Sequence, residues 1–200
     1  MERNIYEEDH EAFRDVVKEF VKRYVTNEKR EQWDAAGEID RATMLAAGEA
    51  GVIGLSVPEE FGGAGMLQDY RFRTVVNEEI IRAGAGSLAG AFGIQDDLAV
   101  PYLVHMGTQE QKETWLPRMA TGEIIGALAM TEPGAGSDLR GISTTAKKTD
   151  GGYIVNGAKT FISSGATADI FVVFVKTGEG NRPDAFSLLL LEADMAGFDH

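Results

Sequence analysis

The chain of 200 residues contains no cysteine. This absence excludes disulfides, thiolate nucleophiles, iron–sulfur clusters and zinc sites with cysteine ligands. Histidine is also scarce: His10, His105 and His200 are the three present, and none stands in a metal-ligand spacing such as HExxH. We therefore expect each histidine to be a surface or packing residue, and we expect no metal site.

Positively charged residues are few: the chain has 19 Lys and Arg against 32 Asp and Glu, which gives a formal net charge of -13. Such a chain repels a phosphate backbone, so we expect no nucleic-acid partner. Any anionic ligand must be held by local donors. No apolar run approaches the roughly 20 residues of a membrane span. The N-terminal segment MERNIYEEDH shows no targeting pattern, so we expect a cytoplasmic protein with no membrane span.

Apolar residues at helical spacing predict helices in the first part of the chain, at 12–24, 42–50, 72–81 and, more softly, 91–106, where Pro101 bends or restarts the helix. Thr108 and Gln111 form a capping-box pattern that opens a last helix ending near Gly122. Glu78 and Glu79 lie on one of these predicted helices, and we interpret them as solvated or capping charges.

After Gly122 the pattern changes to short β-rich runs separated by Gly, Asp and Asn: IIGALAM, GISTTAKK, YIVNGAKTFISSG, DIFVVFVKT and AFSLLLLE. Asn156-Gly157 predicts a hairpin turn, since both turn positions tolerate positive φ. The predicted fold class is α+β, with an all-α domain at residues 1–122 followed by a β-barrel or sandwich-like domain at 123–200. A barrel or sandwich needs more strands than remain here, so we expect the chain to be truncated within a longer architecture.

Two glycine-rich patterns are rejected on their spacing. GAGSDLRG is two residues longer than the dinucleotide fingerprint G-x-G-x-x-G, and Pro133 precedes it where a strand should enter the turn. Gly152, Gly157 and Lys159-Thr160 imitate a phosphate-binding P-loop, but Ala158 separates the glycine from the lysine.

The segment TEPGAGSD remains as a loop leaving a predicted strand. Pro133 stiffens the exit, the glycines bare the backbone, and Thr131 and Ser137 offer neutral donors. Residue chemistry alone leaves a pyrophosphate or ring-edge site and a plain β-turn equally open. Phe161 and Ser163 fall on one face of the strand predicted after the hairpin. There a ring-packing role competes with an ordinary core aromatic, and the core role is favoured.

IIGALAMTEPGAGSDLRG resembles the flavin-binding signature of the acyl-CoA dehydrogenases. GGYIVNGAKTFISSG and ADIFVVFVKT downstream, and GVIGLSVPEEFGGAG and HMGTQEQKETWLPRMATGE upstream, resemble the same family in the same order. The wording AMTEPGAGSDL resembles the long-chain type most. The resemblance implies an N-terminal helical domain, a middle β-domain and a C-terminal helical bundle, the last absent from this chain.

The resemblance also implies a function. Enzymes of this family use FAD to remove two hydrogens from the α and β carbons of an acyl-CoA thioester. A carboxylate takes the α-proton, and the flavin accepts hydride from the β-carbon. The resemblance places the catalytic base C-terminal to His200, so we expect no catalytic residue in this chain and no activity from it alone. The implied partners are acyl-CoA, an electron-transferring flavoprotein, and further copies in a homotetramer or homodimer.

By motif position, the resemblance assigns the flavin ring to a strand end and a later segment, and the pyrophosphate to the loop between them. The cofactor-binding residues so implied are Leu128, Met130, Thr131, Gly136, Ser137, Phe161, Ile162 and Ser163. Ser137 would also contact the substrate's CoA, and many relatives carry Trp in place of Phe161. Glu132 and Asp138 are expected to hold the loop. The segment 92–98 is expected to line the acyl pocket.

Two alternatives remain open. An acyl-CoA oxidase, a nitroalkane oxidase or a flavin-dependent hydroxylase would keep this fold and change the chemistry. A non-catalytic partner subunit would keep the fold and lack the base.

Overall fold

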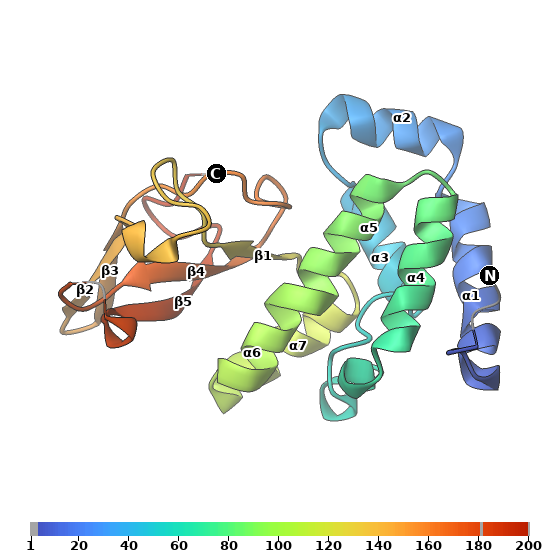
Figure 1. Cartoon of the computed structure of the whole chain (residues 1–200), viewed down its shortest axis with the longest axis horizontal. Helices are drawn as coiled ribbons and strands as arrows, with labels where there is room; N and C mark the ends of the chain where they lie inside the picture. Colours follow the sequence, from blue (N-terminus) through green and yellow to red (C-terminus); the bar gives the residue numbers. More distant parts are fainter. Residues whose placement is uncertain (1–3, 181, 200) are drawn as a thin grey trace. The chain divides into compact units, whose positions relative to one another are not determined.

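The computed structural model describes residues 4–180 and 182–199. The chain divides into two compact units, Met1–Ile125 and Gly126–His200. Figure 1 shows that the first is built of helices and the second on a β-sheet. This order confirms the predicted α+β class. The predicted domain boundary, between residues 122 and 123, stays a prediction.

The helical unit contains α-helices, short 3₁₀ turns and one π-helical turn. Their bounds are α1 (Glu8–Tyr24), α2 (Asn27–Ala36), α3 (Arg41–Glu49), η1 (Glu59–Phe61), η2 (Met66–Gln68), α4 (Tyr70–Arg82), α5 (Gly86–Gly93), the π-turn η3 (Ile94–Ala99), α6 (Val100–Met106) and α7 (Gln109–Ala120). The predicted capping box opens α7, with Thr108 and Gln111 in their expected roles. The apolar pattern does not predict α2, because Trp33 is the only buried residue of this helix and the helix therefore carries no apolar stripe.

Helices α1 and α4 lie side by side (Figure 1). An ionic network links them: Arg14, only 7% exposed, places Nη1 2.8 Å from both Glu78 Oε2 and Glu79 Oε1. Tyr6 also donates to Glu78 at 2.9 Å. The expectation that Glu78 and Glu79 are solvated is therefore wrong. The helical pattern identified their helix but not which side of it meets α1.

Two of the three histidines lie among the described residues. His10 is 2% exposed, its ring centroid lies 4.3 Å from that of Phe72, and Nε2 is 3.3 Å from Asp69 Oδ2. It is a packing residue, and His105 is a surface residue, as predicted. His200 lies outside the described residues.

The segment predicted as one soft helix contains the π-turn η3. Pro101 stands in the first turn of α6, where its missing N–H is tolerated. The junction residues on both sides of η3 keep right-handed helical dihedrals, so the helical backbone continues through η3 and does not restart at the proline. The wider π-turn before it turns Asp96 into the interior, where the carboxylate is 0% exposed. Asp96 accepts hydrogen bonds from the backbone N–H of Gly54 at 3.0 Å and of Leu55 at 3.3 Å.

The second unit contains a mixed sheet. Its strands are β1 (Gly126–Ala129), β2 (Thr145–Thr149), β3 (Gly152–Asn156), β4 (Ile170–Lys176) and β5 (Phe186–Glu192). β4 is the centre: β5 pairs antiparallel with its full length, and β1 pairs parallel with Ile170–Val173. β2 joins β4 at one register, Thr145 opposite Lys176. Of these strands β4 contributes the most buried apolar residues, five of its seven.

The hairpin of this unit is displaced from its predicted place. β2 and β3 pair from Thr149↔Gly152 to Thr145↔Asn156, so Asp150-Gly151 form the turn and the prediction of Asn156-Gly157 is wrong. Gly157 serves a close approach instead, because a Cβ there would lie 2.3 Å from Thr144 Oγ1 and 2.6 Å from Thr144 Cα. Both dipeptides tolerate turn geometry, and packing selects between them.

Candidate functional site

The loop 130–144 is fixed at both ends to a single strand. β1 ends at Ala129, paired with Val173, and Lys176 N donates to Thr144 O at 2.8 Å just before β2 begins. Only two residues of β4 separate Val173 from Lys176, while fourteen residues of chain run between Ala129 and Thr144. The motif TEPGAGSD must therefore bulge outward from this edge of β4, which makes it available to a ligand.

A tight turn closes the first part of this loop. Glu132 N donates to Ala135 O at 2.8 Å, and Ala135 N donates back to Glu132 O at 3.1 Å. Pro133 and Gly134 are the central residues, where the missing N–H of proline costs nothing. The turn places Gly134 at its centre and Gly136 directly after it, and both glycines are exposed.

The Glu132 carboxylate holds the far end of the loop. Oε2 accepts from Ser143 N at 2.6 Å and Ser143 Oγ at 2.7 Å, and Oε1 accepts from Thr144 N at 3.0 Å and Lys159 Nζ at 2.9 Å. Burial by itself raises the pKa of Glu132, but the bonds from Thr144, Ser143 and Lys159 outweigh it and hold the pKa far below its usual range. The predicted loop-holding role of Glu132 is confirmed.

Asp138 has a smaller structural role. It precedes the 3₁₀ turn η4 (Leu139–Gly141), and its Oδ1 accepts from Arg140 N and Arg140 Nε, each at 3.1 Å. Both side chains of this pair are exposed. Asp138 therefore caps the turn locally and is held at the surface by Arg140.

A second segment is joined to the strand end. Thr160 N donates to Thr131 O at 3.0 Å, and Thr131 Oγ1 donates to Thr160 O at 2.8 Å. Lys159 Nζ donates to Met130 O at 2.9 Å. The structure thus brings together the two motif regions that the sequence separates by almost thirty residues. Because the Thr131 hydroxyl proton is used in this link, its oxygen can accept from a ligand but not donate to it.

The segment 161–163 is a loop, so the prediction of a strand there is wrong. Phe161 has φ +56 and its side chain is 93% exposed, and Ser164 has φ +60. The favoured interpretation of Phe161 as a core aromatic is also wrong. A bulky residue with positive φ carries backbone strain. Here the strained residue presents an aromatic plane outward, beside the exposed Ser163 and the half-buried Ile162.

The remaining loop residues are open. Gly136 and Ser137 are exposed, and a Cβ built on Gly134 or Gly136 would meet nothing within 4 Å. Neither glycine has a positive φ. These glycines are therefore not required by turn geometry or by internal packing. The open space leaves room for a group to approach the backbone, as a pyrophosphate held by N–H donors requires.

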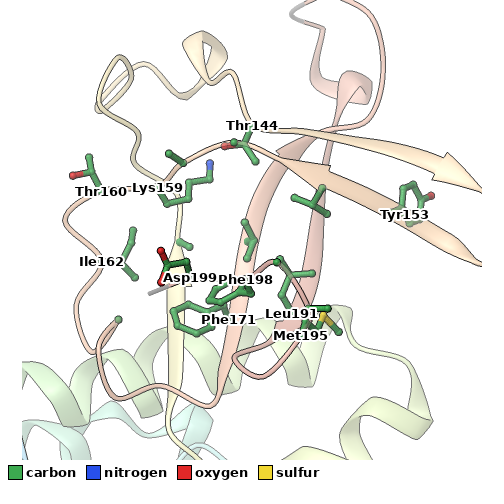
Figure 2. A pocket seen from close by; sticks show the side chains of 18 of the residues that line it. Thr144, Tyr153, Lys159, Thr160, Ile162, Phe171, Leu191, Met195, Phe198 and Asp199 are labelled. Atoms are coloured by element: carbon green, nitrogen blue, oxygen red, sulfur yellow. The ribbon is translucent and has the colours of Figure 1, made fainter.

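A cavity of about 790 Å³ lies in the sheet unit (Figure 2). Phe171, Leu191, Met195 and Phe198 form its apolar part, and Lys159, Thr144 and Thr160 lie along one side. Phe161 and Ile162 are the predicted site residues that line it. Ala129 also does, whereas its strand neighbours Leu128 and Met130 do not, as alternation along β1 requires.

The predicted residues described so far therefore divide into two groups. Thr131, Phe161 and Ile162 are drawn together by the hydrogen bonds at Thr160, whereas Gly136 and Ser137 lie farther along the outward loop. Within the described residues no cluster of His, Asp and Glu is suited to a metal ion, and none of the described helices is long and apolar enough to cross a membrane.

Comparison with known proteins identifies the family. The model of the acyl-CoA dehydrogenase N-terminal domain matches residues 7–123, and that of the acyl-CoA dehydrogenase middle domain matches residues 127–200. The chain belongs to the acyl-CoA dehydrogenase family. The long-chain specific acyl-CoA dehydrogenase of Rattus norvegicus mitochondria is 38% identical over 198 residues, which cover 98% of this chain and 45% of that protein.

Solved structures of acyl-CoA dehydrogenases are also similar to this chain. An acyl-CoA dehydrogenase from Geobacillus kaustophilus shares 40% identity at a TM-score of 0.90, covering 98% of this chain and 51% of that one. An acyl-CoA dehydrogenase from Bacillus anthracis, complexed with FAD, shares 33% identity at a TM-score of 0.82, covering 98% and 33%. The chain thus spans about half the length of the rat and Geobacillus relatives, and a third of the Bacillus anthracis one.

Sequence reasoning missed the partner of Glu132. The sequence around Lys159 imitates only a P-loop, and no motif marks Ser143 or Thr144 as partners of an acid. A spacing of 27 residues between Glu132 and Lys159 matches no helical or strand period, so no local pattern pairs them. A signal was present nonetheless: Glu132 lies within one segment that resembles the family, IIGALAMTEPGAGSDLRG, and Lys159 lies within another, GGYIVNGAKTFISSG.

Proposed function

We propose that this chain forms the FAD-binding and acyl-CoA-binding part of an enzyme that dehydrogenates acyl-CoA thioesters between the α and β carbons. Family membership supports this proposal, as does the FAD complex of the Bacillus anthracis relative. The observation that carries it is the outward aromatic plane of Phe161, held in a strained loop beside the strand end that bears Thr131. The long-chain substrate type is a finer proposal, supported by the name of the rat relative.

The residues present fit a flavin. The exposed ring of Phe161 offers a packing surface, with Ile162 and the Ser163 hydroxyl beside it. Leu128, Met130 and Thr131 would meet the ring's polar edge, where the Thr131 oxygen would accept. Gly136 and Ser137 would hold the pyrophosphate through backbone N–H groups and a hydroxyl, and Ser137 would also contact CoA. The flavin supplies the hydride acceptor, and these residues supply orientation.

No carboxylate of this site suits the role of general base. A base must accept a proton near the working pH. The pKa of Glu132 is held far below its usual range by four hydrogen bonds, and the pKa of Asp138 is lowered by Arg140. We therefore retain the proposal that the catalytic base lies C-terminal to His200.

Assembly and location are further proposals. Homotetramers or homodimers, and electron transfer to an electron-transferring flavoprotein, follow from family membership alone. The cytoplasmic location also stays a prediction, and the rat relative is mitochondrial. Sedimentation tests the oligomeric state, and cell fractionation tests the location.

Flavin titration tests the central proposal. FAD added to the protein should bind with a shift of the visible flavin band and quenching of its fluorescence. Phe161→Ala should weaken binding about tenfold, within the range of a lost aromatic contact, whereas Phe161→Trp should retain it. Met106→Ala, which removes another exposed apolar side chain from the helical unit, is the matched control. Absence of binding by the unaltered protein would refute the proposal.

Binding and chemistry are separable outcomes. Anaerobic addition of acyl-CoA esters of different lengths should bleach the bound flavin if a base is available. Because the base is proposed to lie C-terminal to His200, binding without bleaching is the result expected of this chain alone, and bleaching by this chain alone would refute that placement of the base. Fast reoxidation of the reduced flavin by air would favour an oxidase.

A further inference from the structure

We propose that Lys159 and Glu132 form a positioning pair that sets the spacing between the strand end 130–132 and the exposed loop bearing Phe161. The proposal rests on the FAD site proposed above. The pair would touch neither substrate nor flavin, and would act through the segments that it joins. Figure 2 shows Lys159 and Thr144 at the same end of the cavity, close to Thr160.

The geometry of Lys159 connects two parts of the candidate site. Its ammonium donates to the Met130 carbonyl and to Glu132 Oε1, both at 2.9 Å. Lys159 stands two residues before Phe161 and directly before Thr160, whose N–H and C=O bond Thr131. Four hydrogen bonds therefore join 130–132 to 159–160, and the lysine makes two of them.

The geometry of Glu132 extends this link to the other end of the loop. Each carboxylate oxygen accepts two hydrogen bonds, one pair from Ser143 and the other from Thr144 and Lys159. One buried group thus fixes the start of the loop, its return at 143–144, and the Phe161 segment. The side chains of Lys159 and Glu132 are only 10% and 3% exposed, so water competes little for these bonds.

The chemistry of the pair explains why it takes these residue types. A carboxylate supplies the acceptor capacity that four donors need, and a neutral amide oxygen cannot match it. A lysine on a four-carbon stem reaches both a carbonyl and a carboxylate with donors that rotate freely. Because Lys159 is committed to these partners, we exclude it as a phosphate ligand.

Lys159→Met, which keeps an unbranched side chain one atom shorter and removes the charge, tests the pair. Lys148→Met on β2 is the matched control, since Lys148 is exposed in the same unit. We expect Lys159→Met to raise the Kd for FAD at least tenfold and to alter the visible spectrum of the bound flavin. The comparison is made at a temperature where circular dichroism shows a folded variant. Lys148→Met should bind as the unaltered protein does.

Hydrogen exchange provides a second measurement that needs no flavin. In Lys159→Met the amides of Ser143, Thr144 and Thr160 should exchange faster, while those of β4 and β5 keep their protection. Glu132→Gln should produce the same pattern. The double variant should add little to either single one, as expected for residues that act as a unit.

The outcomes separate the two proposals. If the unaltered protein binds FAD and Lys159→Met binds it equally tightly, the positioning pair is refuted and the proposed function stands. If the unaltered protein does not bind FAD, the proposed function fails, and hydrogen exchange alone decides whether the pair orders the loop. Unchanged exchange at Ser143, Thr144 and Thr160 would overturn the pair in either case.

Discussion

Two buried carboxylates, one in each unit, have pKa values displaced in opposite directions, although burial alone raises both. Asp96 in the helical unit is 0% exposed and accepts two backbone hydrogen bonds. Burial raises its pKa to about 6, against the opposing effects of the Arg73 charge and these bonds. Glu132 in the sheet unit is 5% exposed, accepts four bonds and is held charged. The number and charge of the donors, more than burial, decide which form of a buried acid is stable.

The nearest cation accounts for the difference. Arg73 Nε lies 3.1 Å from Asp97 Oδ1 and so bonds the neighbour of Asp96, whereas Lys159 bonds Glu132 itself. The charged form of Asp96 is therefore destabilised relative to its neutral form, whereas the charged form of Glu132 is stabilised by the hydrogen bonds that hold the loop. The charge at Glu132 is also the one that the candidate site depends on.

Glu132→Ala should give the largest effect. The substitution leaves a buried ammonium at Lys159 and removes the acceptor of Ser143 and Thr144, so the free energy of unfolding should fall by about 3–5 kcal/mol. Urea unfolding followed by circular dichroism measures the loss. Glu179→Ala, at an exposed carboxylate of the same unit, should change it by less than about 0.5 kcal/mol. Equal losses in both variants would contradict the comparison.

Asp96→Asn should change the pH dependence of stability. A raised folded-state pKa means that the folded protein binds more protons than the unfolded chain between about pH 4 and pH 6, so the unaltered protein loses stability as the pH rises through that window. The loss relative to Asp96→Asn should be about 1–3 kcal/mol. Thermal unfolding from pH 4 to pH 7 measures it, and parallel curves would show that burial does not raise this pKa.

Asp40→Ala should cause an intermediate loss of stability. The pH dependence of that loss should have the opposite sign to the one caused by Asp96. Burial raises the pKa of Asp40, but hydrogen bonds from Trp33, Lys29 and Thr43 lower the pKa by more than burial raises it, to about 2. The capping carboxylate of α3 should therefore contribute about 1–2 kcal/mol at pH 7, a contribution that shrinks as the pH falls from about 4 toward 2. Chemical unfolding at pH 7 and pH 3 tests this, and a pH-independent difference would remove the electrostatic explanation.

Arg140→Met should give the smallest effect. The Asp138–Arg140 pair is exposed on both sides, and such pairs contribute about 0–1 kcal/mol. We expect less than about 0.5 kcal/mol in urea unfolding. A larger loss would mean that the 3₁₀ turn, and not Glu132 alone, holds the loop.

The elements of the fold follow from local patterns where those patterns are strong. The apolar stripe of α1, the capping box of α7 and the β-rich run of β4 all predict the elements observed. Helix α2 lacks such a stripe, and the wrong hairpin came from two turn-compatible dipeptides six residues apart. The contact of Gly157 with Thr144 is a tertiary constraint, and local turn preferences do not contain it.

The sequence predicts which segments form the candidate site. It does not predict the backbone conformation and the hydrogen bonds that hold them together. The family motif marks the segments around Thr131 and Phe161, and hydrogen bonds at Thr160 bring these together. The positive φ of Phe161 is not visible in its residue type, because such a residue normally avoids that conformation. The bonds of Glu132 to Ser143 and Thr144 join the end of β1 to the start of β2, two strands that meet β4 at distant points in the sequence, and no local period encodes that meeting.

The shared edge of β4 also has a kinetic consequence. The hairpins β2–β3 and β4–β5 close over short stretches of chain, whereas β1 must find β4 across some forty residues. Distant pairings cost more chain entropy and form more slowly than local ones. We expect the two hairpins to fold first and β1 to dock last. The loop between β1 and β2 would then acquire its shape only at the final step, so protection of its amides during refolding would mark completion of the unit.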